Sequence, residues 1–268
     1  RAEKRTTARN HDPGGERLRL GGRRQPRRCW RRGVLTCTAA NDMRIIYVTA
    51  CLPWGIGEPF IVPEIRALRR RGHEVLVVPR SPSGQLLHRD AEDLRSICVA
   101  TPLLSPAVIG GALLTLAQKP WATLRECATL RASRTLGILA KNAAVTAKAL
   151  WLARLAAAWK AEHIHAHWAA TTATMAMIAS RLSGIPFSIT AHRWDIAENN
   201  LVGLKSLTAE FIRAIDEPGA DELAAHIAPA GRKPVVIHMG VELPAALSEA
   251  PAECRRLVIP ARLDEKKG

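Results

Sequence analysis

Three short segments of this 268-residue chain carry side chains that could bind a polar ligand. They are the loop Trp54 to Glu58 (WGIGE), the trio His163, His165 and His167, and the segment His192 to Asp195 (HRWD). Each forms part of, or directly follows, a short apolar or β-branched run of the kind that makes a buried strand. Because ligands bind at the carboxyl ends of parallel strands, we expect these segments to converge there.

In the first segment, Gly55 and Gly57 would let backbone amides approach an anionic or sugar ligand beside a helix N-terminus. The dinucleotide fingerprint is not met, since Phe60 occupies the third glycine position and Arg80 follows the next strand in place of a ribose-binding acid. This departure disfavours a nicotinamide- or flavin-dependent dehydrogenase or a Rossmann-type epimerase.

In the last segment, His192 follows a strand and lies close in sequence to Thr190 and Asp195. A histidine at the mouth of a sheet, with a hydroxyl and a carboxylate nearby, can donate a hydrogen bond to a sugar or balance developing charge. The alternative is a structural or solvated loop histidine.

The trio His163, His165 and His167 has a spacing of two, which places all three on one face of a strand. Three aligned imidazoles could hold zinc. Metal sites usually draw their ligands from several elements, however, so the pattern favours structural or substrate-facing histidines and we predict no metal.

From Met43 onward, short β-branched runs alternate with helical stretches, which predicts an α/β fold with a Rossmann-like parallel sheet and helices on both faces. Residues 105–160 are predicted to be largely helical, and Val145, Ala149 and Leu152 to share an inward face. Residues 80–95 are expected to form a loop and Ile97 to Ala100 a weak strand. The main expected strands are 44–49, 74–79, 163–168, 186–190, 209–215 and 234–239.

The formal charge of +15 is unevenly distributed. Residues 1–42 hold 12 Lys and Arg against 4 Asp and Glu, a net +8, and the remainder carries +7. This basic arm lacks apolar periodicity, which predicts disorder. It either lies upstream of the true start, since the first methionine is Met43, or tethers the chain to nucleic acid or an anionic membrane. The shortage of aromatic residues in it makes nucleic acid an unlikely partner.

Residues 96–118 contain no charged side chain over a length that could span a bilayer. Pro102, Pro106 and the pair Gly110 and Gly111 interrupt this run. A strand followed by a short helix is therefore the favoured interpretation. Contact with a membrane surface ranks second among the alternatives, and a transmembrane span ranks last.

Five sequence blocks, in order, resemble glycosyltransferase family 4, and most closely its exopolysaccharide and colanic-acid branch. The similarity extends from about Met43 to Gly268. It implies a GT-B architecture of two Rossmann-like domains, of which this chain carries the N-terminal half, and retaining sugar transfer that requires no metal and no cofactor. The blocks are FIVPEIRALRRRGHEVLVVP, HIHAHWAATTATMAMIASRLSGIPFSITAHRWDI, AEFIRAIDEPGADEL, VVIHMGVEL and ARLDEKKG.

The resemblance also implies roles for individual residues. His192 matches a catalytic histidine that contacts the donor sugar, and Gly55 and Gly57 lie in the loop near the diphosphate and acceptor. Arg262 and Lys267 match the basic pair that clamps the donor phosphates. The further substrate-binding candidates at the edge of the sheet are Trp54, Glu58, His167 and Asp195.

The expected organisation is a basic arm (1–42), an acceptor-side domain (43–240), a linker (241–256) and the first strand and turn of a nucleotide-sugar-binding domain (257–268). On this reading the chain alone is inactive, because the paired glutamates that hold the donor would lie beyond Gly268.

The predicted function is transfer of a sugar from a nucleotide-diphosphate sugar to a polysaccharide or lipid-linked acceptor. The alternative is a non-catalytic polyanion-binding module that uses the basic arm. Six cysteines without a CxxC pair favour reduced thiols. We therefore expect a cytoplasmic protein. The basic excess and the uncharged helices after Cys98 suit peripheral contact with the inner face of an anionic membrane.

Overall fold

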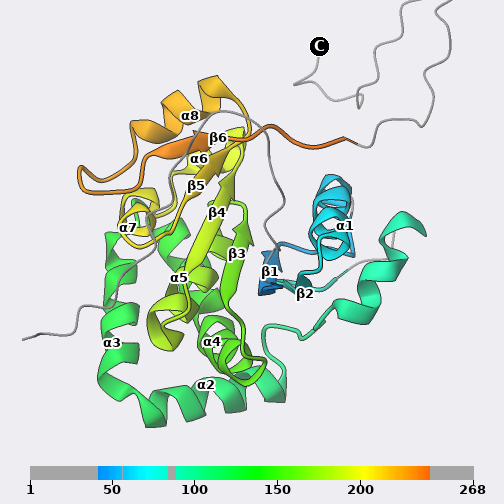
Figure 1. The fold of residues 1–268 in the computed structure, drawn as a ribbon. Coiled ribbons are helices and arrows are strands. Elements are labelled where there is room, and N and C mark those ends of the chain that lie inside the picture. Colours follow the sequence, from blue (N-terminus) through cyan, green and yellow to red (C-terminus); the bar gives the residue numbers. More distant parts are fainter. Residues whose placement is uncertain (1–41, 56, 84–88, 242–268) are drawn as a thin grey trace, which may run out of the picture. The chain divides into compact units, whose positions relative to one another are not determined.

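The structure is a computed structural model that describes residues 42–55, 57–83 and 89–241. Its centre is a six-stranded, all-parallel sheet with the strand order β2-β1-β3-β4-β5-β6 (Figure 1). The predicted parallel α/β sheet is thereby confirmed. The strands are β1 (Arg44–Thr49), β2 (Glu74–Pro79), β3 (His163–His167), β4 (Phe187–Ala191), β5 (Ile212–Ala214) and β6 (Pro234–Val236).

Helices cover both faces of the sheet, as the alternating sequence pattern predicts. One face is covered over β1 and β2 by a short 3₁₀ turn η1 (Pro59–Ile61) and α1 (Val62–Arg70). The other face is covered by the long helices α4 (Leu136–Ala158) and α5 (Thr171–Ser183), as Figure 1 shows. The remaining helices are α2 (Pro106–Gln118), α3 (Pro120–Thr129), α6 (Arg193–Glu198), α7 (Val202–Ser206), α8 (Glu217–Ala224) and the 3₁₀ segments η2 (Arg89–Ile97) and η3 (Leu130–Ala132).

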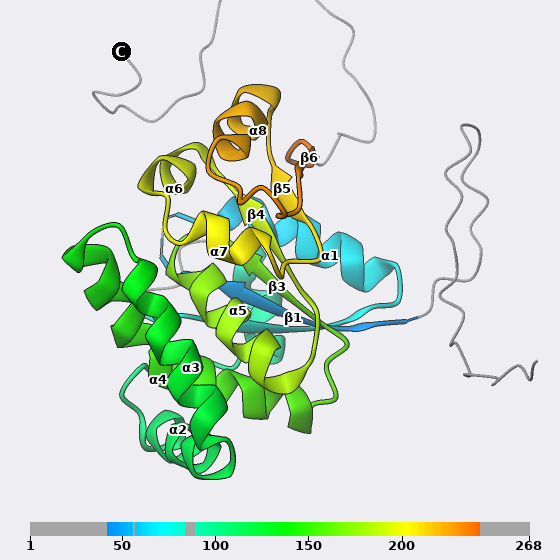
Figure 2. The ribbon, with the colours of Figure 1, turned by 90° about the vertical axis from the view of Figure 1, so that its left-hand side faces the viewer.

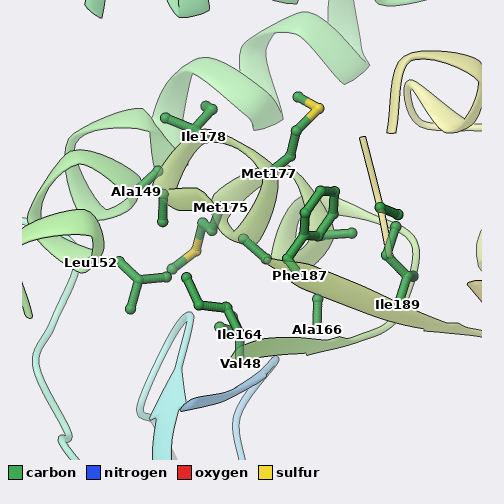
Figure 3. Close-up of a cluster of buried hydrophobic side chains, with 14 of the residues drawn as sticks. Val48, Ala149, Leu152, Ile164, Ala166, Met175, Met177, Ile178, Phe187 and Ile189 are labelled. Carbon is green, nitrogen blue, oxygen red and sulfur yellow. The ribbon is translucent and has the colours of Figure 1, made fainter. Parts of the chain in front are cut away.

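The main core lies between the sheet and the pair α4 and α5 (Figure 3). Helix α5 is buried almost all round, which explains why its sequence is apolar or small on every side and lacks a polar face. It ends at Gly184, whose φ of +77° is the left-handed conformation that favours glycine at a helix C-terminus. Truncating a fully buried core residue such as Ile164 to alanine should cost roughly 2–5 kcal/mol.

Two local predictions are wrong. Ile97 to Ala100 forms no strand; only a single bridge joins Cys98 to Val77 at the edge of the sheet. The expected loop 80–95 is partly helical, because residues 89–97 form η2. The apolar residues Ala91 and Leu94 of η2 are buried against the α1 side of the sheet, so tertiary packing overrides a locally polar composition.

The predicted helical region 105–160 breaks into three helices, because Pro120 begins α3 where α2 ends. Val145, Ala149 and Leu152 are buried on one face of α4, as predicted. Helix α2 has 13 residues, so it is about 20 Å long, shorter than the roughly 30 Å hydrocarbon core of a bilayer. Throughout the described ranges, no helix has both the length and the apolar character needed to cross a membrane.

The order of the strands also fixes where a ligand can bind. From β1 the chain moves outward to β2 and then returns to the opposite side of β1 to form β3, so the winding direction reverses between β1 and β3. In open parallel sheets the crevice at the carboxyl ends of the strands beside this reversal is the usual ligand site. The expected arm, the linker beyond Val241 and the strand at 257–268 lie outside the described residues, apart from Asp42.

Candidate functional site

The candidate site lies where the loops that follow β1, β3 and β4 meet. The loop after β1 is held by the carboxylate of Glu58, which is 3% exposed. Its oxygens accept hydrogen bonds from the backbone N–H groups of Ala50 (2.8 Å), Cys51 (2.6 Å) and Leu52 (2.7 Å). A fourth hydrogen bond comes from the indole Nε1 of Trp168, at 2.6 Å. Glu58 therefore joins the loop after β1 to the loop after β3, across the point where the sheet reverses.

Aromatic rings gather directly beside this junction. Trp168 follows β3 with a φ of +83°, and its indole centroid lies 4.4 Å from the imidazole of His192. Phe60, from the start of the first helical segment, lies 5.4 Å from His192 and 5.8 Å from Trp168. Trp194 lies 5.4 Å from Trp168 and is 55% exposed, so an aromatic surface reaches solvent at the edge of the sheet.

His192 and His167 form the polar centre of this cluster. Their Nε2 atoms lie 2.7 Å apart, a distance that requires one shared proton between them. Burial, with the nearby positive charge of Arg213, lowers the pKa of His192 to about 4, and burial lowers the pKa of His167 well below its usual range. Both imidazoles are therefore neutral at pH 7. Neutral rings can donate and accept hydrogen bonds, but they supply no positive charge.

Beneath the histidines, Asp195 and Lys205 hold the loop backbones. The buried carboxylate of Asp195 accepts hydrogen bonds from the backbone N–H groups of Ala169 and His192. The fully buried Nζ of Lys205 donates to the carbonyls of Ala169, Ala170 and Asn200 at 2.8, 2.8 and 2.5 Å.

Burial acts on both charged groups, raising the pKa of Asp195 and lowering that of Lys205, while the attraction between them opposes each shift. Together the two side chains fix the loop after β3 relative to His192.

A second polar network lies on the same face of the sheet, below the site. His165 lies within hydrogen-bonding distance of Ser188 (2.8 Å) and Thr190 (3.1 Å) on β4. Arg213 on β5 donates to Glu64 at 2.7 Å and to the backbone carbonyls of Ile237 and His238 at 2.7 and 2.9 Å. These contacts tie α1 and the segment after β6 to the sheet.

A cavity of about 660 Å³ opens beside this network, next to α1, and residues such as Tyr47, His163 and Phe211 line it. Neither His192 nor Trp168 borders this cavity.

In the part of the chain that the structure describes, no three His, Cys, Asp or Glu side chains gather in a way that could hold a metal ion. The three histidines on β3 instead lie within hydrogen-bonding distance of the Ser188 hydroxyl on β4 or of the His192 imidazole just after β4.

The structure brings together Glu58, His167, His192 and Asp195 among the predicted site residues. All four are at least 92% buried, so most of their polar atoms contact protein. Trp54 is not among the rings that contact His192, and Gly57 is exposed at the tip of the loop after β1. Gly55 has a φ of +83°, which favours glycine in that turn. Arg262 and Lys267 lie outside the described residues.

Sequence reasoning missed Phe60, Trp168, Lys205 and Arg213. Phe60 and Trp168 had an available signal, because each is an aromatic residue directly beside a loop already identified as a candidate. Lys205 and Arg213 had none. Lys205 lies in a short helix whose sequence gives no indication of burial, and the position of Arg213 opposite Glu64 depends on residues 149 positions apart.

The comparison with family models assigns a family to this chain. Residues 62–232, more than half of the chain, match the model of the glycosyl transferase 4-like domain, and the matched segment includes His167, His192 and Asp195. No curated protein matches the chain.

Two solved structures among those similar to this chain are UDP-N-acetylglucosamine 2-epimerase from Rickettsia bellii and the glycosyltransferase SnogD from Streptomyces nogalater. The epimerase is 11% identical, with a TM-score of 0.39 over 70% of this chain and 43% of its own. SnogD is 22% identical, with a TM-score of 0.38 over 80% of this chain and 57% of its own. The chain thus spans about half of the length of each.

The match over residues 62–232 is the finding that assigns the family, and the parallel sheet with a site at its carboxyl edge is the architecture that the resemblance to glycosyltransferases implies. This chain belongs to the glycosyl transferase 4-like domain family.

Proposed function

We propose that this domain forms the acceptor-side half of a retaining glycosyltransferase, which transfers a sugar from a nucleotide-diphosphate sugar to a polysaccharide or lipid-linked acceptor. The observation that carries the proposal is the cluster at the carboxyl edge of the sheet, where His192 packs against both Trp168 and Phe60 and contacts His167. In this proposal the nucleotide sugar is a co-substrate, and the reaction needs no metal and no organic cofactor.

The cluster has the chemistry that sugar recognition requires. Aromatic faces pack against the apolar C–H side of a sugar ring, and Trp168 and Trp194 offer such faces at the edge of the sheet. A neutral imidazole can exchange a hydrogen bond with a sugar hydroxyl beside them. Since the pKa of His192 is lowered to about 4, the ring stays in this neutral form throughout the physiological range.

The charge that develops on the leaving diphosphate must be balanced elsewhere, because His192 is neutral. Fixed cations stabilise a leaving diphosphate without reorganisation. We assign that role to Arg262 and Lys267. In the same proposal Gly55, Gly57 and Trp54 border the acceptor and the diphosphate, while Glu58 and Asp195 hold the loops and do not contact the sugar directly.

We place the reaction on the cytoplasmic side of a membrane that carries lipid-linked acceptors. Two features support this placement. The chain has a strong basic excess, and acceptors of a growing cell-surface polysaccharide are built on lipid carriers at an anionic bilayer surface. The exopolysaccharide branch named by the sequence resemblance uses acceptors of this kind.

The test is transfer of a radiolabelled sugar. The protein, together with the donor-binding half that this proposal requires, is incubated with a panel of uridine-, guanosine- and adenosine-diphosphate sugars and with membranes that contain lipid-linked saccharides. Label should pass to the lipid fraction with one donor, retaining the anomeric configuration, and His192→Ala should abolish most of the transfer. The matched control His226→Ala alters a histidine outside the cluster. Transfer that is equally fast in His192→Ala would refute the role of this site.

A further inference from the structure

Six exposed apolar side chains lie along α2 and α3, far from the histidine cluster in sequence. We call this region the α2–α3 surface. Trp121 is 82% exposed and Leu113 is 61% exposed, so most of each side chain lies in solvent. The surface consists of Ile109, Leu113, Leu114, Leu116, Trp121 and Leu124.

The apolar face of α2 follows from its sequence. Val108, Ala112 and Thr115 point toward α4, and Thr115 donates hydrogen bonds to the carbonyls of Gly111 and Leu150. Any side chain at Gly111 would collide with Trp151, so glycine allows α2 to pack closely on α4. The residues left on the solvent side of α2 are apolar or small up to Gln118, whereas surface helices normally carry charged side chains there.

The charged side chains that are exposed between Ile97 and Glu162 are all basic. Between Ile97 and Glu162 the only acidic residue is Glu126, which is 2% exposed and lies 3.0 Å from the guanidinium of Arg181. Three arginines, Arg125, Arg131 and Arg134, are exposed along α3 and just beyond it. Figures 1 and 2 show α2 and α3 meeting at a corner on the outside of the helical layer, with α3 facing the viewer in Figure 2.

We propose that the α2–α3 surface binds an anionic lipid bilayer by inserting its leucines and Trp121 among the headgroups while the three arginines contact lipid phosphates. Tryptophan is favoured at the boundary between water and lipid. Short apolar helices flanked by basic residues lie within that boundary and do not cross it. Association with a second copy through this surface is disfavoured, because it would bring arginines of like charge together in a chain of net charge +15.

The inference deepens the proposed function by naming the surface that would hold the domain near a lipid-linked acceptor, and its purpose rests on that function. Binding itself is measured without donor or acceptor. A protein that binds vesicles but transfers no sugar when the donor-binding half is supplied would overturn the proposed function alone. A protein that transfers sugar but ignores vesicles would overturn only this inference.

The experiment is co-sedimentation of the full 268-residue chain with vesicles of phosphatidylcholine, with or without phosphatidylglycerol. The apolar variant carries Leu113→Ser, Trp121→Ser and Leu124→Ser. Its matched control carries Leu207→Ser, Val235→Ser and Val241→Ser at apolar residues that are also exposed but lie elsewhere. Both retain residues 1–42, so any binding through the basic arm is common to them.

We expect the wild type to partition into anionic vesicles at least tenfold more strongly than into neutral ones. The apolar variant should lose at least tenfold of this partitioning and the control should lose none. Replacing Arg125, Arg131 and Arg134 by glutamine should also lower partitioning at least tenfold, and replacing Arg71, Arg232 and Lys233 should have a smaller effect.

Trp121→Ser alone guards against misfolding of the triple variant, since this side chain is exposed at the start of α3, and it should lower partitioning severalfold with an unchanged circular dichroism spectrum. Three outcomes would overturn the inference. They are a wild type that does not sediment with anionic vesicles, an apolar variant that sediments like its control, and a wild-type dimer that the apolar variant converts to a monomer.

Discussion

The Nε2 atoms of His167 and His192 lie 2.7 Å apart, and this contact joins the end of β3 to the start of α6. Because both rings are neutral, one donates the proton that lies between them and the other accepts it. The hydrogen bond therefore couples the tautomers of the two rings and, together with the ring of Trp168 that lies tilted against His192, holds the orientation of His192. His167 acts through His192, as a positioning residue.

This relationship predicts a graded loss of sugar transfer. His192→Ala should lower kcat/KM about 100-fold, roughly 3 kcal/mol of transition-state stabilisation, which is typical of removing one positioned hydrogen-bond donor. His192→Gln keeps an amide that can donate and should retain part of the activity. His167→Phe keeps a ring but leaves His192 without its partner, so we expect about a tenfold loss in kcat. Equal rates for the His167→Phe variant and the wild type would show that the hydrogen bond has no positioning role.

Glu58 offers a test of the loop geometry. Four N–H donors point at its carboxylate, three from the backbone and one from Trp168. Glu58→Gln would direct an NH₂ group at two of these donors and leave them buried without acceptors. We expect a loss of about 2–4 kcal/mol in the free energy of unfolding, measured by urea denaturation.

The control Glu74→Gln alters an exposed carboxylate that pairs with Arg44 at the surface, so it should change stability by less than about 1 kcal/mol. If both variants were equally stable, the carboxylate of Glu58 would be hydrated and not a fixed acceptor. Its role as a ligand of the substrate would then become the better explanation.

The sequence predicted β1 and β2 well because both strands are nearly continuous apolar runs. Residues 44–49 and 74–79 were expected as strands and form β1 and β2 with those limits. Such strands are buried on both faces, so composition alone identifies them. The residues at Cys98 failed as a strand because one bridge at the edge of a sheet depends on the neighbouring chain and not on local propensity.

The candidate site was predicted only in outline. The spacing of His163, His165 and His167 correctly indicated that they share a face, since period two is a property of every strand. The contacts that make the site depend on pairs far apart in sequence, such as Trp168 with Glu58 at a separation of 110 residues. No local sequence pattern predicts such a pair. Nor does one predict that Lys205 is buried and attracted to Asp195.

Two glycines separate a ligand effect from a folding effect. A side chain at Gly57 would meet no protein atom, so Gly57→Ala should leave the unfolding free energy within about 0.5 kcal/mol of the wild type. If the loop lies against the diphosphate or acceptor, as we propose, the added methyl should raise KM several-fold.

Gly72→Ala is the contrasting variant. Gly72 has a φ of +93° and a side chain there would collide with the carboxylate of Asp42, so we expect a loss of about 1–3 kcal/mol in stability. Thermal unfolding and transfer kinetics of both variants test the pair. A Gly57→Ala enzyme with unchanged KM would place the substrate away from this loop.

The buried histidines predict how stability depends on pH. Burial lowers the pKa of His165 to about 3 and that of His192 to about 4, and it also lowers the pKa of His163 and of His167. In the unfolded chain these groups titrate near pH 6.5. Between about pH 4 and pH 6.5 these histidines therefore bind more protons in the unfolded state than in the folded state, so their contribution to stability falls as the pH drops through this window. The raised pKa of Asp195, about 7, acts in the opposite direction.

His165 alone should account for roughly 3 kcal/mol of this loss by pH 4, since its folded form stays unprotonated there. Protonation of its ring would require the hydroxyls of both Ser188 and Thr190 to act as acceptors, because both ring nitrogens would then donate. His165→Gln removes the titrating group and keeps a side chain that can bond Ser188 or Thr190. Urea denaturation between about pH 7 and pH 4.5 should show a shallower decline in the free energy of unfolding for His165→Gln than for the wild type.

The exposed His238→Gln serves as the matched control and should follow the wild-type curve. Parallel curves for all three proteins would mean that His165 is protonated in the folded state, and the neutral imidazole network on this face of the sheet would have to be abandoned.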